Sequence, residues 1–172
     1  MKNKTKGFTL MEVLVALVVL SIGLLGIAGM QLFSLKSNQD SSLRTQATYI
    51  AYSLIDKMRA NRTVALAGTY DIAVGTGPSG TQNCYTSNCT AIQLAAFDLN
   101  LWKCELGNFS GDAICTTTLN VTPALPLGDG SVVLNVLNNE VTILVQWQDS
   151  ANRKDLNLVT TPPQSLQIVA QL

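Results

Sequence analysis

Residues 7–35 read GFTLMEVLVALVVLSIGLLGIAGMQLFSL, an apolar run with no proline and a single charged side chain, that of Glu12. As an α-helix, residues 8–35 would extend about 42 Å at a rise of roughly 1.5 Å per residue. The hydrocarbon core of a bilayer is about 30 Å thick, so this length suffices to cross it with tilt. The run therefore predicts a membrane-spanning helix, with a short leader before it and a water-soluble domain after it.

The rest of the chain divides into a basic leader and a weakly charged domain. The leader contains Lys2, Lys4 and Lys6, which leaves eight basic and eleven acidic residues after residue 7. Since the chain has 172 residues, we expect one domain in addition to the helix. Its mildly acidic balance gives no reason to expect nucleic-acid binding.

The start of the chain differs from an ordinary secretory signal. Such a signal has an apolar region of about 7 to 15 residues followed by a cleavage site of small residues, whereas this apolar run is much longer. An uncleaved signal anchor would explain the length. It would leave unexplained both Gly7, which separates the basic leader from the apolar run, and Glu12.

Residues 6–13, KGFTLMEV, resemble the class III signal of type IV pilins and of type II secretion pseudopilins. The resemblance implies that a prepilin peptidase cleaves between Gly7 and Phe8 on the cytoplasmic side and that Phe8 is then N-methylated. Glu12 becomes the fifth residue of the mature chain, the position of the family's characteristic glutamate. Because a carboxylate in hydrocarbon costs a few kcal/mol unless it is paired, we expect Glu12 to meet the Phe8 amine of a neighbouring helix and to set the register of assembly.

Three glycines, Gly23, Gly26 and Gly29, recur within the apolar run. Each weakens a helix by roughly 1 kcal/mol relative to alanine. They are compatible with close packing of helices, or with a segment that melts on entry into a fibre. Major pilins often carry a proline in this region and this chain has none, so both alternatives stay open.

Residues 36–62 keep a helical period but become two-faced. The apolar positions that share one face are Leu43, Ala47, Ile50, Leu54 and Met58. We therefore expect one helix from near residue 8 to near residue 62, with this stripe covered by a sheet. Four charged residues near its end are expected to form a solvated face: Asp56, Lys57, Arg59 and Arg62.

The middle of the chain contains all four cysteines. Residues 63–88 are rich in glycine, serine and threonine and predict loops. Four cysteines allow three disulfide connectivities; the simplest pairs Cys84 with Cys89 and Cys104 with Cys115. A zinc site is the alternative, but the spacing is unfamiliar for zinc, and no metal is expected.

A short helix is predicted between the two cysteine pairs. Residues 90–93, TAIQ, form a capping box, and Gly107 supplies a stop signal. The apolar positions at helical spacing between them are Ile92, Ala95, Leu99, Trp102 and Leu106. We expect Trp102 to belong to the core.

The C-terminal third predicts strands. Residues 131–137 and 140–147 are rich in β-branched residues and are separated by Asn138 and Asn139, a favourable two-residue hairpin turn. Residues 156–160 and 166–172 predict two further strands. Along residues 141–147 every second side chain is apolar, so one face of this strand should cover the long helix.

Together these elements predict an α+β protein with the type IV pilin fold: a long N-terminal helix packed on a C-terminal antiparallel sheet of three or four strands. Residues 1–7 would be the cleaved leader, 8–35 the transmembrane and assembly helix, and 36–172 the periplasmic or extracellular head. The start of the chain, residues 47–62, residues 98–102 and the VTILVQWQD strand are most similar to PilV-type minor pilins.

That resemblance implies a structural subunit that helps to initiate pilus assembly and enters the fibre at low abundance, at or near the tip. Its partners would be prepilin peptidase, the major pilin, other minor pilins, the inner-membrane assembly machinery and, before assembly, membrane lipid. It would wait in the inner membrane with its head in the periplasm and end in the fibre at the cell surface.

Two other functions are compatible with parts of the sequence, and a third is not expected. A minor pseudopilin of a type II secretion system would share the same cleavage chemistry. An adhesin or DNA-uptake tip would use residues 63–88. An enzyme is not expected, nor a cofactor, because the chain has no histidine and no C-x-x-C pair, which removes Ser-His, Cys-His and dithiol chemistry.

Overall fold

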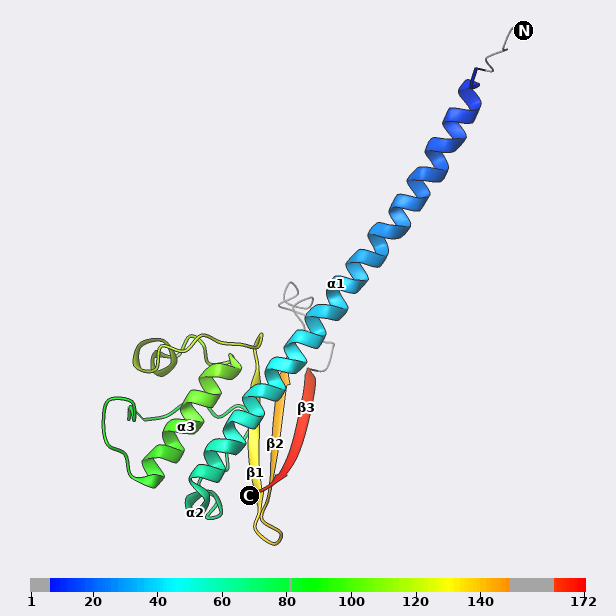
Figure 1. Cartoon of the computed structure of the whole chain (residues 1–172). Coiled ribbons are helices and arrows are strands. Elements are labelled where there is room, and N and C mark those ends of the chain that lie inside the picture. Colours follow the sequence, from blue (N-terminus) through cyan, green and yellow to red (C-terminus); the bar gives the residue numbers. More distant parts are fainter. Residues whose placement is uncertain (1–6, 81, 149–162) are drawn as a thin grey trace, which may run out of the picture. The chain divides into compact units, whose positions relative to one another are not determined.

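The computed structural model describes residues 7–80, 82–148 and 163–172. It forms two compact units, one ending at Ser41 and the other beginning at Ser42. The helices are α1 (Leu10–Ala60), α2 (Arg62–Ala65) and α3 (Ala91–Leu106), followed by a π-helical turn, η1 (Ile114–Thr118). The strands are β1 (Asp129–Asn135), β2 (Glu140–Trp147) and β3 (Gln164–Gln171) (Figure 1).

Helix α1 is a single helix of 51 residues, as the unbroken sequence pattern predicted. It begins two residues later than expected and ends at Ala60, where Asn61 leaves the helical conformation before the short α2. In the unit that begins at Ser42, the predicted apolar stripe faces inward: Ala47, Ile50, Leu54 and Met58 are buried, and Leu43 is partly buried. Ala51 and Ile55 widen the stripe.

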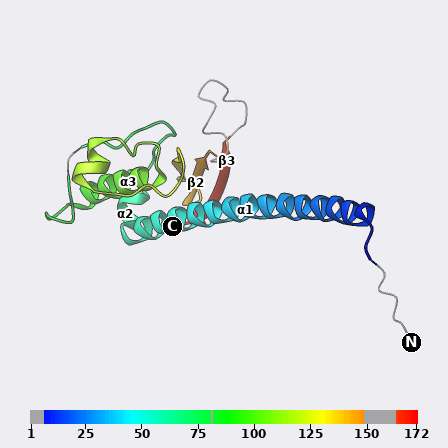
Figure 2. The same ribbon diagram turned by 90° about the horizontal axis from the view of Figure 1, so that it is seen from above.

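The sheet is an antiparallel meander in the order β1-β2-β3. Every second residue of β2 is buried, and these residues share one core cluster with the buried face of α1 and with Trp102 of α3. Figure 2 shows the later part of α1 alongside β2 and β3. The prediction that one face of this strand covers the long helix is therefore confirmed. The strand predicted at residues 156–160 lies outside the described residues.

The predicted two-residue turn at Asn138 and Asn139 is wrong. Strand β1 ends at Asn135, which pairs with Glu140, so four residues connect the strands. The side chain of Asn135 accepts a hydrogen bond from the backbone N–H of Leu137 at 3.1 Å, and Asn139 has a φ of 55°. An asparagine side chain that bonds the backbone two residues on forms a turn by itself, and this ends the strand early.

Helix α3 has the predicted ends. The Thr90 side chain accepts a hydrogen bond from the backbone N–H of Gln93, the Gln93 side chain accepts one from the backbone N–H of Thr90, and Gly107 adopts a φ of 112°. Trp102 is buried, as expected. The predicted inward position of Ile92 is wrong: its side chain is 64% exposed, because the first turn of α3 is not covered by the core.

The expected solvated face at the end of α1 is only partly confirmed. Arg59 pairs with Asp56 at 3.5 Å, and both side chains are at least half exposed. Arg59 and Arg62 also bond to the C-terminal end of the chain. Arg59 donates a hydrogen bond to the carbonyl oxygen of Gln171 at 3.4 Å, and Arg62 donates one to that of Leu172 at 3.1 Å. They therefore tie α1 and α2 to the last strand.

Candidate functional site

The first candidate region is the start of α1. Gly7, Phe8 and Thr9 precede the helix. The Thr9 side chain accepts a hydrogen bond from the backbone N–H of Glu12 at 3.3 Å, so Thr9 acts as the N-cap. Glu12 lies in the first turn, where a negative charge interacts favourably with the helix dipole. Residues 7–9, which include the expected cleavage site, are therefore an exposed non-helical segment that leads into a capped helix start.

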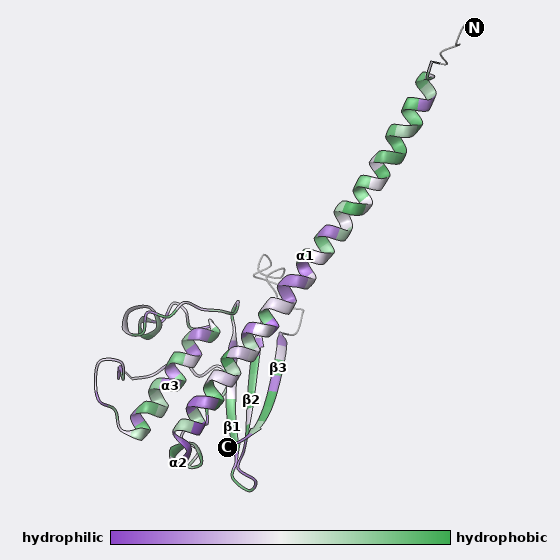
Figure 3. Cartoon of the chain, viewed as in Figure 1, coloured by the Kyte–Doolittle hydropathy of each residue, from purple (hydrophilic) through white to green (hydrophobic). Residues whose placement is uncertain are grey.

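The first compact unit presents a long apolar surface. All its described side chains are exposed, including Phe8 at 83% and Leu25 at 73%. Figure 3 shows the hydrophobic colouring along the first part of α1 and the mixed colouring that follows. Among the described helices, α1 is the one that is long and apolar enough to cross a membrane. A surface of this size needs a lipid or protein environment to cover it.

The three glycines within the apolar part of α1 do not interrupt the helix, which is continuous through Gly23, Gly26 and Gly29. A Cβ atom added at any of them would meet no atom within 4 Å. The described chain therefore gives no reason of its own for glycine at these positions. Packing against another helix and local melting both remain compatible with them.

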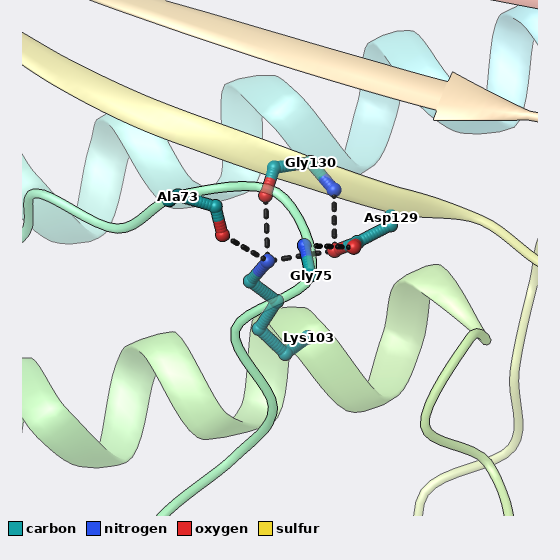
Figure 4. Close-up of polar contacts among 5 residues, drawn as sticks. All are labelled: Ala73, Gly75, Lys103, Asp129 and Gly130. Carbon is teal, nitrogen blue, oxygen red and sulfur yellow. Dashed lines mark hydrogen bonds and ion pairs between the residues drawn. The ribbon is translucent and has the colours of Figure 1, made fainter.

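The second candidate region is a buried ion pair in the head, between α3 and the start of β1. The Lys103 Nζ atom donates hydrogen bonds to Asp129 Oδ1 at 2.6 Å, to the carbonyl oxygen of Gly130 at 2.6 Å and to that of Ala73 at 3.0 Å (Figure 4). Its side chain is fully buried. Burial lowers the pKa of Lys103, and the hydrogen bond and charge of Asp129 oppose this shift.

The Asp129 carboxylate completes this cluster. It accepts hydrogen bonds from the backbone N–H of Gly75 at 2.6 Å and from that of Gly130 at 2.7 Å. Three donors of the ammonium group and both oxygens of the carboxylate are therefore used, which is the condition under which a buried ion pair is tolerated. The cluster fixes residues 73–75 against α3 and β1.

Other polar side chains of α3 hold the same loop. Asn100 accepts a hydrogen bond from the Ser79 backbone N–H at 2.9 Å and donates one to its carbonyl at 2.7 Å. Tyr70 donates its hydroxyl hydrogen to Asp98 at 2.8 Å. Burial raises the pKa of Asp98, while the Tyr70 hydrogen bond and the charge of Lys57 oppose that shift. These polar contacts add to the apolar ones by which Tyr70 and Ile72 join the core of the head.

One disulfide precedes α3, and the other joins the last turns of α3 to η1. The structure pairs Cys84 with Cys89 and Cys104 with Cys115. The second disulfide is buried in a small cluster with Phe97 and Leu119. With all four sulfurs used in this way, no free thiol is present, and the described residues contain no group of three or more metal-ligating side chains.

The polar core of the head was not predicted from the sequence. Asp98, Asn100 and Lys103 lie within a largely apolar helix, and Asp129 stands between Gly128 and Gly130. Polar residues on the inward face of a helix could have pointed to buried partners. The partners themselves could not be predicted from the sequence, because Lys103 and Asp129 are 26 residues apart in the chain.

Comparison with known families identifies two regions of the chain. Residues 2–28 match the prokaryotic N-terminal methylation motif. Residues 29–100 match the family described as type IV pilin Tt1218. No curated protein and no solved structure matches the chain.

Proposed function

Because the chain belongs to the type IV pilin family, we propose that it is a minor pilin, which helps to initiate pilus assembly and enters the fibre at low abundance, at or near its tip. Type IV pilins are structural proteins rather than enzymes. One observation carries the proposal: Glu12 is the only charge in an exposed apolar run, and it stands at the fifth position after Gly7.

Processing is the first step that we propose. The N-terminal methylation motif implies a prepilin peptidase, which would cleave between Gly7 and Phe8 and methylate the new amine of Phe8. The exposed, non-helical backbone of residues 7–9 supports this, since a peptidase needs an accessible extended segment. Cleavage removes the three lysines of the leader and creates a cationic N-terminus beside the apolar helix.

Assembly is the second step. A carboxylate surrounded by hydrocarbon is costly unless it is paired, and the new amine of Phe8 on an adjacent subunit is the partner that cleavage provides. In a low-dielectric environment this attraction is much stronger than in water. Glu12 would therefore favour one axial offset between neighbouring helices. The exposed apolar surface of residues 8–35 would leave membrane lipid for the packed centre of the fibre.

Location and partners follow from the same steps. We propose that the precursor lies in the inner membrane with residues 36–172 in the periplasm, and that the mature subunit lies in the fibre at the cell surface. Its partners would be the prepilin peptidase, the major pilin, other minor pilins and the inner-membrane assembly machinery. We propose the PilV-type subtype on the resemblance of residues 47–62 and of the VTILVQWQD strand to such minor pilins.

The second candidate is a minor pseudopilin of a type II secretion system, which the same motif favours equally. Deletion of the gene separates the two. A minor pilin predicts loss of surface pili with normal protein secretion, whereas a pseudopilin predicts the reverse.

Two substitutions test the two steps. Gly7→Leu should leave an uncleaved precursor in the membrane, whereas Gly23→Leu, its control beyond the cleavage site, should be processed normally. Equal processing of both variants would refute the proposed site. Glu12→Leu should be cleaved but excluded from sheared pili, whereas Asp40→Leu removes a carboxylate from the polar part of α1 and should be incorporated. Normal incorporation of Glu12→Leu would refute the role of Glu12.

A further inference from the structure

The head has a groove between α1 and the C-terminal end of α3. Its volume is about 460 Å³. Five of its lining residues belong to α1 and two come from α3 and the segment after it: Thr45, Gln46, Tyr49, Ile50, Ser53, Glu105 and Ala124. All of them belong to the compact unit that begins at Ser42.

One aromatic side chain of α1, that of Tyr49, lines the groove, and a second, that of Tyr52, lies nearby on the same helix outside the groove. Tyr49 is 76% exposed, and Tyr52 is half exposed. A second hollow of about 430 Å³ lies along the same helix, and Tyr49 and Ser53 line both hollows. Exposed tyrosines beside a concavity are typical of protein interfaces.

Glu105 differs from the other acidic residues that the structure describes in the compact unit beginning at Ser42. The side chains of the others all bond to a described residue: Asp56, Asp71, Asp98, Asp112, Asp129 and Glu140. The carboxylate of Glu105 has no hydrogen bond or ion pair to any residue that the structure describes, although it is partly buried. Burial raises its pKa, and the charge of Lys57 opposes this shift.

We propose that the groove receives a lysine or arginine side chain from the head of an adjacent pilin-type subunit, with the aliphatic part on Tyr49 and the cationic group on Glu105. Long basic side chains combine an apolar stem with a charged end, which matches an apolar wall that ends in a carboxylate. An acidic or purely apolar occupant would leave Glu105 repelled or unpaired.

The occupant is assigned to a neighbouring subunit because of the position of the groove in the chain. Thr45 follows the apolar run of residues 8–35 in the same continuous helix. If that run packs against other subunits, the next turns of α1 are the first part of the head that a neighbour can reach. The inference therefore rests on the proposed function.

The test is photo-crosslinking in pilus-producing cells with the full chain. A benzophenone amino acid replaces Tyr49 in one strain and Leu14, in the apolar run, in another. Tyr49 should form an adduct with a pilin-type subunit, at a peptide that contains lysine or arginine. In the Tyr49 strain, Glu105→Gln should reduce the yield of this adduct by about tenfold, because a charge-assisted hydrogen bond contributes roughly one decade in affinity. Glu140→Gln, the same change on the β1–β2 hairpin, should leave the yield unchanged.

The outcomes separate this inference from the proposed function. Pilin adducts from Leu14 without adducts from Tyr49 would overturn the groove assignment while the chain remains a pilus subunit. A Tyr49 adduct whose yield does not depend on Glu105, or one formed with lipid, would overturn it as well. The absence of pilin adducts at both positions would refute the proposed function and the groove assignment together.

Discussion

Replacing Lys103 with methionine should destabilise the head strongly. The two side chains have similar length, so the substitution removes the charge and leaves most of the packing in place. It removes three hydrogen bonds and leaves the carboxylate of Asp129 buried without its cation. Breaking a buried ion pair in this way costs about 3–5 kcal/mol, a large part of the roughly 5–15 kcal/mol by which a domain is stable.

A second substitution distinguishes the ion pair from simple packing. In the double variant Lys103→Met with Asp129→Asn, the buried charge is gone and the amide oxygen can still accept from a backbone N–H. We expect the loss to fall to about 1–3 kcal/mol, the cost of unsatisfied neutral groups. The double variant should therefore be more stable than the single variant, although it carries more changes.

The assay is equilibrium unfolding of the full chain in a mild detergent, monitored by tryptophan fluorescence. Trp102 and Trp147 are both buried and report on the core of the head. Arg44→Met, at an exposed position of α1, is the control and should lose less than about 1 kcal/mol. A loss below about 1 kcal/mol for Lys103→Met, or a double variant less stable than the single one, would refute the assignment of the ion pair as the anchor of the loop.

Three further predictions concern the same fold. The pKa of Asp98 is raised above its ordinary value near 3.8. Between these two pKa values the folded chain binds more protons than the unfolded chain. The contribution of Asp98 to the free energy of unfolding therefore falls as the pH rises through that window. Asp98→Asn should remove this dependence; thermal unfolding that varies equally with pH in both proteins would contradict it. Gly130→Ala would push a Cβ against Trp102 and a β2 carbonyl and should cost about 1–3 kcal/mol, whereas Gly111→Ala meets open space and should be neutral on denaturant unfolding. Thr90→Ala should cost about 1 kcal/mol through loss of the α3 cap, and an unchanged unfolding midpoint would exclude that role.

The sequence predicted the parts of the fold that depend on local periodicity. The continuous helix, the capped α3 and the alternating burial of β2 follow from patterns that repeat within a few residues, so no distant partner has to be known. The signal at the start of the chain could also be predicted locally, because the basic leader, Gly7 and Glu12 stand at fixed spacing within 13 residues.

The remaining features depend on contacts between distant segments. Lys103 is buried because Asp129 and Ala73, from two other parts of the chain, accept its hydrogen bonds. Without knowledge of these partners, a lysine is expected on the surface. The hairpin was misjudged because Val136 and Leu137 favour strands, whereas the Asn135 side chain ends the strand before them. The groove at Glu105 depends on how α3 packs beside α1, which no local pattern encodes.

The central claim is that Phe8 becomes the methylated start of a pilus subunit. Mass spectrometry of the N-terminal peptide from chain isolated out of sheared surface pili tests this most directly. The account predicts a peptide that begins with N-methyl-Phe8 and contains Glu12. A peptide that still contains Gly7, or a processed chain that begins at any other residue, would contradict it.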